Sequence, residues 1–397
     1  MARALALLPA RVQGGLRLED STTWGGNVLE EHGAAPGGGT RHHLFVAEMV
    51  EHCGLTTWRQ NSRIVRAVSD EGVLGPYERA QEVVPVWSHN PQVLRMPKGD
   101  LLLFHIGSGT EGLSHPPKMC PAAPHGTTPC REKAQHQMTF AGKHQSQDAK
   151  AATRLQHDKN ESFPFTFPLH HAESLAGPWQ SHEAAISFDV GDNANPSPVV
   201  FPNGTVLILF HALNFAIAES VGTDWRGPYK LRSTKACGAG EDPFLYIDQR
   251  GYFHCLSHAA PFSHPRSSIV HSFSRDGYTW TVSKTGATAG SEIDYGAAHG
   301  KVLFSKRERP KLMFNEKREI THLISGVTLT PECTPRFLYS DGVDGKLPDA
   351  CQNETMQYHL SNRNPCPGHF DRGFTLIQEV ETRATASTHE FAPMAES

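Results

Sequence analysis

Gly240-Glu241-Asp242-Pro243-Phe244-Leu245-Tyr246 is one of four copies of a pattern that decides the fold of this chain. In each copy polar residues lead into a proline, and a short apolar strand, a turn and a second apolar strand follow. The other three copies begin His89-Asn90-Pro91, Asn195-Pro196 and Glu308-Arg309-Pro310, and Gly25-Gly26-Asn27-Val28-Leu29 is a degenerate fifth copy. Internal repetition of this kind predicts a repeated architecture.

A second repeated phrase closes most of the units. It combines Gly-Pro with an aromatic residue, as in Gly75-Pro76-Tyr77, Gly177-Pro178-Trp179 and Gly227-Pro228-Tyr229. Short apolar segments bounded by Gly, Pro, Asn or Asp dominate each unit, which is typical of strands joined by tight turns. One unit therefore holds about four strands, the content of a propeller blade. We predict an all-β, five-bladed β-propeller with four-stranded antiparallel blades.

The repeats also set the expected boundaries. We place the propeller at residues 20–330, with blades at 20–85, 86–187, 188–235, 236–285 and 286–330. Residues 111–160 are rich in His, Gln, Lys, Pro and Ala without periodicity, so we expect an inserted surface loop in blade two. Residues 1–19 are expected to be disordered or the remnant of a signal peptide. Residues 331–397 should contain a Cys-containing flap, a ring-closing strand near 372–381 and a disordered tail.

Composition narrows the partners and the compartment. The formal net charge is −4 and no long basic run is present, which argues against nucleic acid as the main partner. No segment is apolar for long enough to span a membrane. Eight cysteines without a Cys-x-x-Cys pair, and three glycosylation sequons, favour a secreted, disulfide-bonded glycoprotein. Reduced thiols in a cytosolic protein are the alternative. We expect a monomer.

The copies should converge in space. In an antiparallel blade the start of the first strand and the end of the second lie at the same edge. A mouth lined by His, Asn, Asp, Glu and Arg suits a hydroxyl-rich ligand such as a carbohydrate. The candidate substrate-binding residues are Asn27, His89, Asn90, His105, Asn195, His211, Asp242, His258 and Arg309.

The stretch Gly240-Glu241-Asp242-Pro243-Phe244-Leu245-Tyr246, followed by Arg250-Gly251-Tyr252-Phe253, resembles the acid-bearing strand of glycoside hydrolase family 43 and its relatives. These are five-bladed propellers of the arabinanase, xylosidase and galactanase type, and the resemblance covers roughly residues 20–330. It implies a base Asp in blade one, a second Asp that tunes the acid, and a Glu that donates the proton. By this resemblance Glu241 is the general acid, whereas Asn27 and Asn195 stand in place of the two Asp residues.

An amide cannot deprotonate water, so the base stays open, with Glu48 and Glu308 as replacements. One hypothesis is a glycosidase acting on a polysaccharide or glycoconjugate, with Glu241 as general acid. The other is a lectin-like propeller that binds glycans and has lost the Asp base. A propeller that serves as a protein scaffold would need an apolar rim patch, which we cannot locate. We predict no cofactor, and a structural calcium ion on the axis, as in some relatives, is the alternative.

Overall fold

The computed structural model describes residues 5–107, 167–186, 194–211, 214–238, 240–259, 269–283, 288–329 and 372–381. It also describes positions 109, 117, 119–120, 188, 333–339, 346 and 349–352. Most of the expected insertion at 111–160, the sequons at Asn160 and Asn353, and the tail beyond residue 381 lie outside these residues. In the described part of the chain, no helix is long and apolar enough to cross a membrane.

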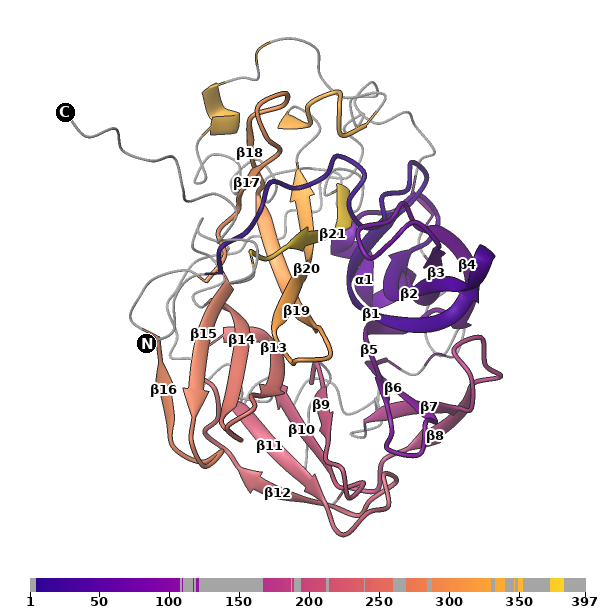
Figure 1. Cartoon of the computed structure of the whole chain (residues 1–397), viewed down its shortest axis with the longest axis vertical. Coiled ribbons are helices and arrows are strands. Elements are labelled where there is room, and N and C mark those ends of the chain that lie inside the picture. The colour runs from indigo at the N-terminus through magenta and orange to yellow at the C-terminus, as the bar shows by residue number, and fades with distance from the viewer. Residues whose placement is uncertain are drawn as a thin grey trace, which may run out of the picture.

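The chain forms an all-β, five-bladed β-propeller of antiparallel sheets, as the sequence predicts (Figure 1). Blade one contains β1 (Thr22–Ala35), β2 (Gly39–Met49), β3 (Ser62–Ser69) and β4 (Glu78–Val84). Blade two contains β5 (His89–Arg95), β6 (Leu101–Ile106), β7 (Pro168–Ala172) and β8 (Gln180–Glu183). Blade three contains β9 (Ser197–Val200), β10 (Val206–His211), β11 (Phe215–Ser220) and β12 (Tyr229–Ser233).

Blade four contains β13 (Gly240–Ile247), β14 (Phe253–Ala259), β15 (Ile269–Ser274) and β16 (Trp280–Val282). Blade five contains β19 (Lys306–Phe314), β20 (Ile320–Leu329) and β21 (Arg372–Glu379). A small hairpin of β17 (Glu292–Asp294) and β18 (Lys301–Leu303) precedes blade five, and the short helix α1 (Trp58–Asn61) lies between β2 and β3. The first strands of the blades contact one another in sequence, and β19 contacts β1, so the ring is closed.

The fifth blade is completed by both ends of the chain. β21, the segment that the sequence analysis places near 372–381, pairs with β20. The N-terminal segment then runs along the free edge of β21, with bridges from Leu7 to Val380 and from Leu16 to Thr375. This differs from the expected boundary at residue 20. Apolar Leu7 packs against blades four and five, and Leu16 packs against blades one and five, so burial holds this segment on the propeller.

Apolar side chains on the blade faces pack into clusters shared by neighbouring blades. Trp24 lies where blade one meets blade five, and its indole ring covers two glycines of blade five. A Cβ atom added at Gly326 would lie 2.5 Å from the Trp24 ring, and one at Gly373 would lie 3.0 Å from it. Blades one and five can therefore meet only because these two positions lack a side chain.

Three disulfides join described residues. Cys53–Cys120 links the β2–β3 connection to the segment after β6, and Cys237–Cys255 joins the start of blade four to β14. Cys333–Cys351 holds part of the region between β20 and β21, where the sequence analysis expects a Cys-containing flap.

Candidate functional site

The repeated polar-Pro pattern is a β-bulge at the start of each innermost strand. The register shifts between Glu241 and Phe244 in blade four, and the same shift occurs in blades one, two and five. One residue of each copy has a positive φ near 45–63°: Gly25, Asn90, Asn195, Asp242 and Arg309. Gly, Asn and Asp adopt this conformation with little strain. Arg309 does so less readily, so its surroundings must hold it there.

These five positions lie at the starts of the first strands of the five blades, which contact one another around the propeller, and we call them the axial ring. The Asn90 side-chain amide donates to Asn195 Oδ1, and Asn195 Nδ2 donates to Asp242 Oδ1 at 3.1 Å. Arg309 Nη1 forms an ion pair with the same Asp242 oxygen. A Cβ atom added at Gly25 would lie 2.9 Å from Arg309 Cβ, so the series of contacts ends at Gly25.

A second layer of polar groups lies two residues farther along the same strands. Gln92 Oε1 accepts hydrogen bonds from Lys311 Nζ at 2.8 Å and from Ser197 Oγ at 3.1 Å. Burial lowers the pKa of the Lys311 ammonium to about 7, although Asp242 acts in the opposite direction. This layer was not predicted from the sequence. The signal for it was the spacing of the repeat, since each residue follows its positive-φ residue by two positions.

Asn27 belongs to this second layer, because the bulge in blade one leaves Gly25 and Gly26 between paired Trp24 and Asn27. Its amide bonds the backbone of Val93 twice, donating to the carbonyl at 2.8 Å and accepting from the N–H at 2.9 Å. The blade-one position equivalent to Asn90 and Asn195 is therefore Gly25, which has no side chain at all. The sequence analysis assigned that position to Asn27, because the glycine pair hid the register.

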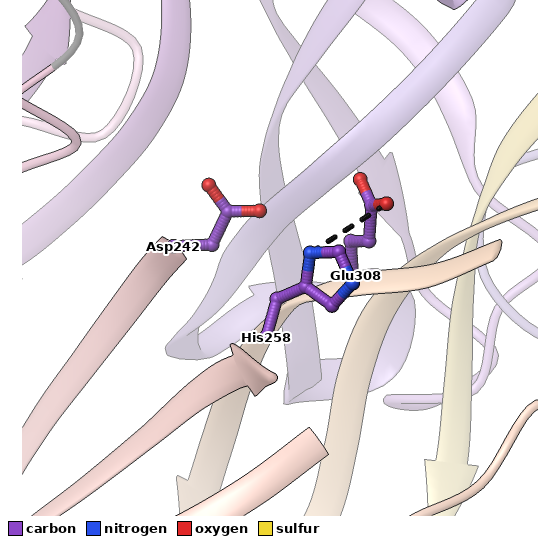
Figure 2. A group of neighbouring side chains, drawn as sticks. All are labelled: Asp242, His258 and Glu308. Carbon is purple, nitrogen blue, oxygen red and sulfur yellow. Dashed lines mark ion pairs between the residues drawn. The ribbon is translucent and has the colours of Figure 1, made fainter. Parts of the chain in front are cut away.

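Three titratable side chains from blades four and five meet beside the axial ring (Figure 2). Asp242 comes from the start of β13, His258 from the end of β14 and Glu308 from the start of β19. One oxygen or nitrogen from each lies within 4.8 Å of the others, and His258 Nδ1 is 3.7 Å from Glu308 Oε1. Asp242 is only 3% exposed. Among the described residues, none forms a hydrogen bond with its Oδ2 atom.

Two carboxylates and an imidazole at this spacing could ligate a metal ion in principle. The surroundings do not favour a calcium ion, which takes about six to eight oxygen ligands. The trio offers one nitrogen and two carboxylates, and Arg309 already neutralises Asp242 from a side chain that is 9% exposed. The arrangement is better suited to hydrogen bonding a hydroxyl group than to holding a cation.

The residue before each positive-φ residue points toward the preceding blade. His89 Nδ1 bonds Ser62 Oγ at 2.7 Å in blade one, Trp24 covers blade five, and Glu308 lies beside His258 of blade four. Glu241 holds the same position in blade four. In blade three, His211 of β10 is the counterpart of His258, because it pairs with the residue before Asn195.

Several predicted site residues have structural contacts. Glu48 is 1% exposed and forms ion pairs with Arg63, at 3.0 Å, and with Arg79. It does not join the group around Asp242, because two arginines of the outer strands hold it inside blade one. His105 Nδ1 bonds the backbone carbonyl of Ile106 at 3.1 Å, and burial lowers the pKa of His105 to about 3.

His89 is fully buried and stacks on Trp58 with 5.1 Å between the ring centroids. Burial also lowers its pKa well below the usual range. The structure thus brings together six of the predicted site residues, whereas His89, His105, Asn27 and Glu48 make other contacts within and between the blades. The six are Asn90, Asn195, Asp242, His258, Glu308 and Arg309.

The closed ring of five blades and the polar axial ring define the class of this protein as a five-bladed β-propeller. No protein-family model matches the chain, and no curated protein matches it. Solved structures do match. The catalytic domain of a glycoside hydrolase family 62 α-L-arabinofuranosidase from Coprinopsis cinerea has a TM-score of 0.50 and 9% identity, covering 95% of this chain and 97% of the other.

Two further matches have lower TM-scores. An α-L-arabinofuranosidase from Podospora anserina, crystallised with cellotriose, has a TM-score of 0.49 and 8% identity, with 96% and 98% coverage. A family 43 β-xylosidase/α-arabinofuranosidase from a compost metagenome has a TM-score of 0.48 and 9% identity, with 97% and 96% coverage. The match with a TM-score of 0.50 shares the five-bladed propeller fold with this chain, which is the fold that the sequence resemblance implies.

Proposed function

We propose that this protein is a glycosidase whose site lies at the mouth of the propeller, between blades four and five. The observation that carries the proposal is the buried group of Asp242, His258 and Glu308, in which Asp242 Oδ2 has no hydrogen-bond partner among the described residues. A buried carboxylate oxygen without a partner is costly, and a ligand hydroxyl would satisfy it. A glycan offers many such hydroxyls in fixed geometry.

Glu241 is proposed as the general acid, in line with the sequence resemblance. Glu308 is proposed as the base that activates water, with His258 beside it. An inverting glycosidase needs about 6.5–9.5 Å between its two carboxyl groups. Asp242 and Glu308 have oxygens within 4.8 Å of each other, so they are not proposed as that pair. Glu241 is paired with Glu308 on the sequence resemblance alone.

Asp242 would then bind the sugar and not protonate the leaving group. Arg309 and Asn195 fix its Oδ1 atom, so Oδ2 is held in one orientation. Such a fixed acceptor orients a sugar hydroxyl without further loss of side-chain entropy. The substrate class is a polysaccharide or glycoconjugate, and the arabinofuranosidase fold of the matched structure makes pentofuranosides the first substrates to try.

A second candidate function is glycan binding without turnover. Gly25 and Asn195 are the observations that favour it, because the positions where the resemblance implies two Asp residues carry no carboxylate. This candidate keeps Asp242, Arg309 and Asn195 as sugar ligands and gives Glu241 no chemical role.

The two candidates separate in one experiment. Turnover of a panel of aryl glycosides is measured for the wild type, Glu241→Gln, Glu308→Gln and the exposed control Glu316→Gln, alongside calorimetric binding of oligosaccharides. Glycosidase activity at this site predicts a loss of about 10²–10⁴-fold in kcat for the first two variants and none for the control. Binding without turnover in the wild type would favour the lectin-like function. Turnover that survives both substitutions would remove these residues from the mechanism.

We also propose that the protein is secreted as a monomer. Three disulfides support an oxidising compartment, and the sequon at Asn203 lies in an exposed turn between β9 and β10. Expression in a secreting eukaryotic host should give a mass shift at Asn203 that enzymatic deglycosylation removes. Retention of the chain in the cytosol with free thiols would contradict the proposal.

A further inference from the structure

A groove is lined by residues of β13, β14, β19 and β20 and of the turns that join β13 to β14 and β19 to β20, at the ends of these strands away from the axial ring. Its volume is about 610 Å³, which suits a short oligosaccharide. The side chains that matter for its chemistry are Tyr246, Asp248, Arg250, His254, Phe314 and Arg318. We call it the blade-turn groove.

The two turns that form the walls of the groove are hydrogen-bonded to each other. The side chain of Gln249, in the blade-four turn, donates to the backbone carbonyl of Lys317 in the blade-five turn. In return, Arg318 Nη2 donates to the carbonyl of Ile247 at 3.3 Å. These bonds cross from one blade to the next in both directions. The groove is therefore formed before any ligand arrives, which lowers the entropy cost of binding.

The polar groups in the groove are also held in place. Asp248 accepts bonds from Arg250 Nε at 2.9 Å, from Arg250 Nη2 at 2.6 Å and from the Tyr252 N–H at 2.9 Å. Burial acts to raise the pKa of Asp248, but these bonds outweigh it and lower the pKa to about 2. The two hydrogen bonds to Asp248 orient the Arg250 guanidinium, which lies over the Tyr252 ring, 4.9 Å from its centroid. Its side chain is nonetheless 69% exposed.

Aromatic surface completes the groove. Phe314 is one of the few large apolar side chains that are exposed among the described residues, at 37%. Tyr246 lies next to it, with 5.4 Å between the ring centroids, and stacks on His254 at 4.7 Å. An exposed ring beside fixed guanidinium and carboxylate groups offers one apolar face and several directed hydrogen bonds. A pyranose ring presents the same combination, C–H groups on its faces and hydroxyls on its edges.

The charges of the groove select among glycans. Two arginines and one aspartate line it, and burial lowers the pKa of His254, which keeps this imidazole neutral at pH 7. Glu316 and Glu319 of the same turn are not among the lining residues, and Glu319 Oε2 accepts a bond from Asn315 at 2.9 Å. The lining therefore has one excess positive charge, which favours a ligand that carries carboxylate or sulfate groups.

We propose that the blade-turn groove is a second glycan-binding site, separate from the mouth, that takes an acidic oligosaccharide bearing carboxylate or sulfate groups. Phe314 supplies the stacking surface, and Arg318 and Arg250 supply the contacts to the acidic groups. The site would hold a polymeric substrate or a cell-surface glycan on the protein while leaving the axial ring accessible. This proposal does not depend on catalysis at the mouth.

Calorimetric titration of the full chain tests the proposal with four probes: a uronate oligosaccharide, a sulfated oligosaccharide, a neutral xylo-oligosaccharide and inorganic sulfate. We expect one of the two acidic oligosaccharides to bind, and the affinity to fall with added salt. Phe314→Ala and Arg318→Ala should each weaken binding by about tenfold or more. Lys235→Ala, which removes an exposed cation that does not line the groove, and Glu241→Gln at the mouth should leave this binding unchanged.

Binding at the groove can be distinguished from activity at the mouth, because the two are measured separately. Groove variants should keep the turnover of small aryl glycosides, if the wild type has any, and their melting temperatures should stay near that of the wild type. Equal binding of the neutral oligosaccharide would overturn the charge argument. Binding of inorganic sulfate with the same affinity as the oligosaccharide would indicate an adventitious ion only. Absence of binding, or binding that survives both groove substitutions, would also overturn the proposal.

Discussion

Replacement of Arg309 by Met should reveal how strongly the axial ring depends on its one ion pair. Asp242 is 3% exposed, and its Oδ1 atom is paired with Arg309 Nη1. After the substitution Asp242 keeps the bond from Asn195 at 3.1 Å and the attraction of nearby Lys311. Removing one partner of a buried ion pair lowers the free energy of unfolding by about 3–5 kcal/mol. Because Asp242 keeps these two contacts, we expect a loss near the lower end of that range.

Urea unfolding at pH 7 measures this loss, and the double variant isolates its cause. Asp242→Asn keeps a residue that tolerates the positive φ of 57° and removes the negative charge. In the double variant Arg309→Met/Asp242→Asn, no charge is left unpaired, so we expect most of the lost stability to return. A coupling free energy below about 0.5 kcal/mol between the two positions would refute the ion-pair explanation.

Three further outcomes follow from buried groups elsewhere. Burial lowers the pKa of His105 to about 3 and of His170 to about 4, so the unfolded chain takes up protons first as the pH falls below 6.5. The free energy of unfolding should fall by up to about 2 kcal/mol per histidine between pH 6.5 and pH 5. His170→Gln should make the free energy of unfolding depend less on pH, whereas substitution of the exposed His32 by Gln should not. Lys311→Met removes an ammonium whose pKa burial lowers to about 7. The increase in the free energy of unfolding should be larger at pH 7 than at pH 9, because the unfavourable burial of the ammonium is larger at the lower pH. An equal increase at both pH values would contradict the lowered pKa. Gly326→Ala should lower the free energy of unfolding by about 1–3 kcal/mol, because the added methyl group would collide with the Trp24 ring. Gly290→Ala is the control and should have little effect, because a Cβ atom there meets no atom within 4 Å. Equal unfolding midpoints for the two variants would show that Trp24 can move aside.

The fold could be predicted because the repeat has a physical cause. Each copy needs a residue of positive φ followed, in four of five blades, by proline, and then a strand buried on both faces. Asn90, Asn195 and Asp242 satisfy that need with residues that favour the conformation, so the pattern is visible in the sequence.

The register of blade one was not readable in the same way. Gly25 and Gly26 carry no side chains, so the sequence offered Asn27 as the nearest polar residue. Only the pairing of Trp24 with Ala47 and of Asn27 with Phe45 shows that Gly25 holds the equivalent position. The ion pairs of Glu48 could not be predicted for a related reason. Its partners Arg63 and Arg79 come from β3 and β4, and ion pairs across strands leave no local signature.

The N-terminal segment could not be placed from its own residues either. Its pairing partner, β21, lies at the other end of the chain, and no local periodicity marks the contact between Leu16 and Thr375. The second layer of the channel was readable in principle. Gln92, Ser197 and Lys311 each lie two positions after the residue of positive φ in their copy, and the spacing of the repeat places all three toward the axis.

The most direct test of the site is a crystal structure of Glu241→Gln soaked with an oligosaccharide that the wild type binds or cleaves. We predict a sugar at the mouth, with a hydroxyl within hydrogen-bond distance of Asp242 Oδ2 and the ring beside Glu308 and His258. Density for the sugar only in the blade-turn groove, or an empty mouth in a crystal whose protein binds the oligosaccharide in solution, would contradict the assignment of the site to blades four and five.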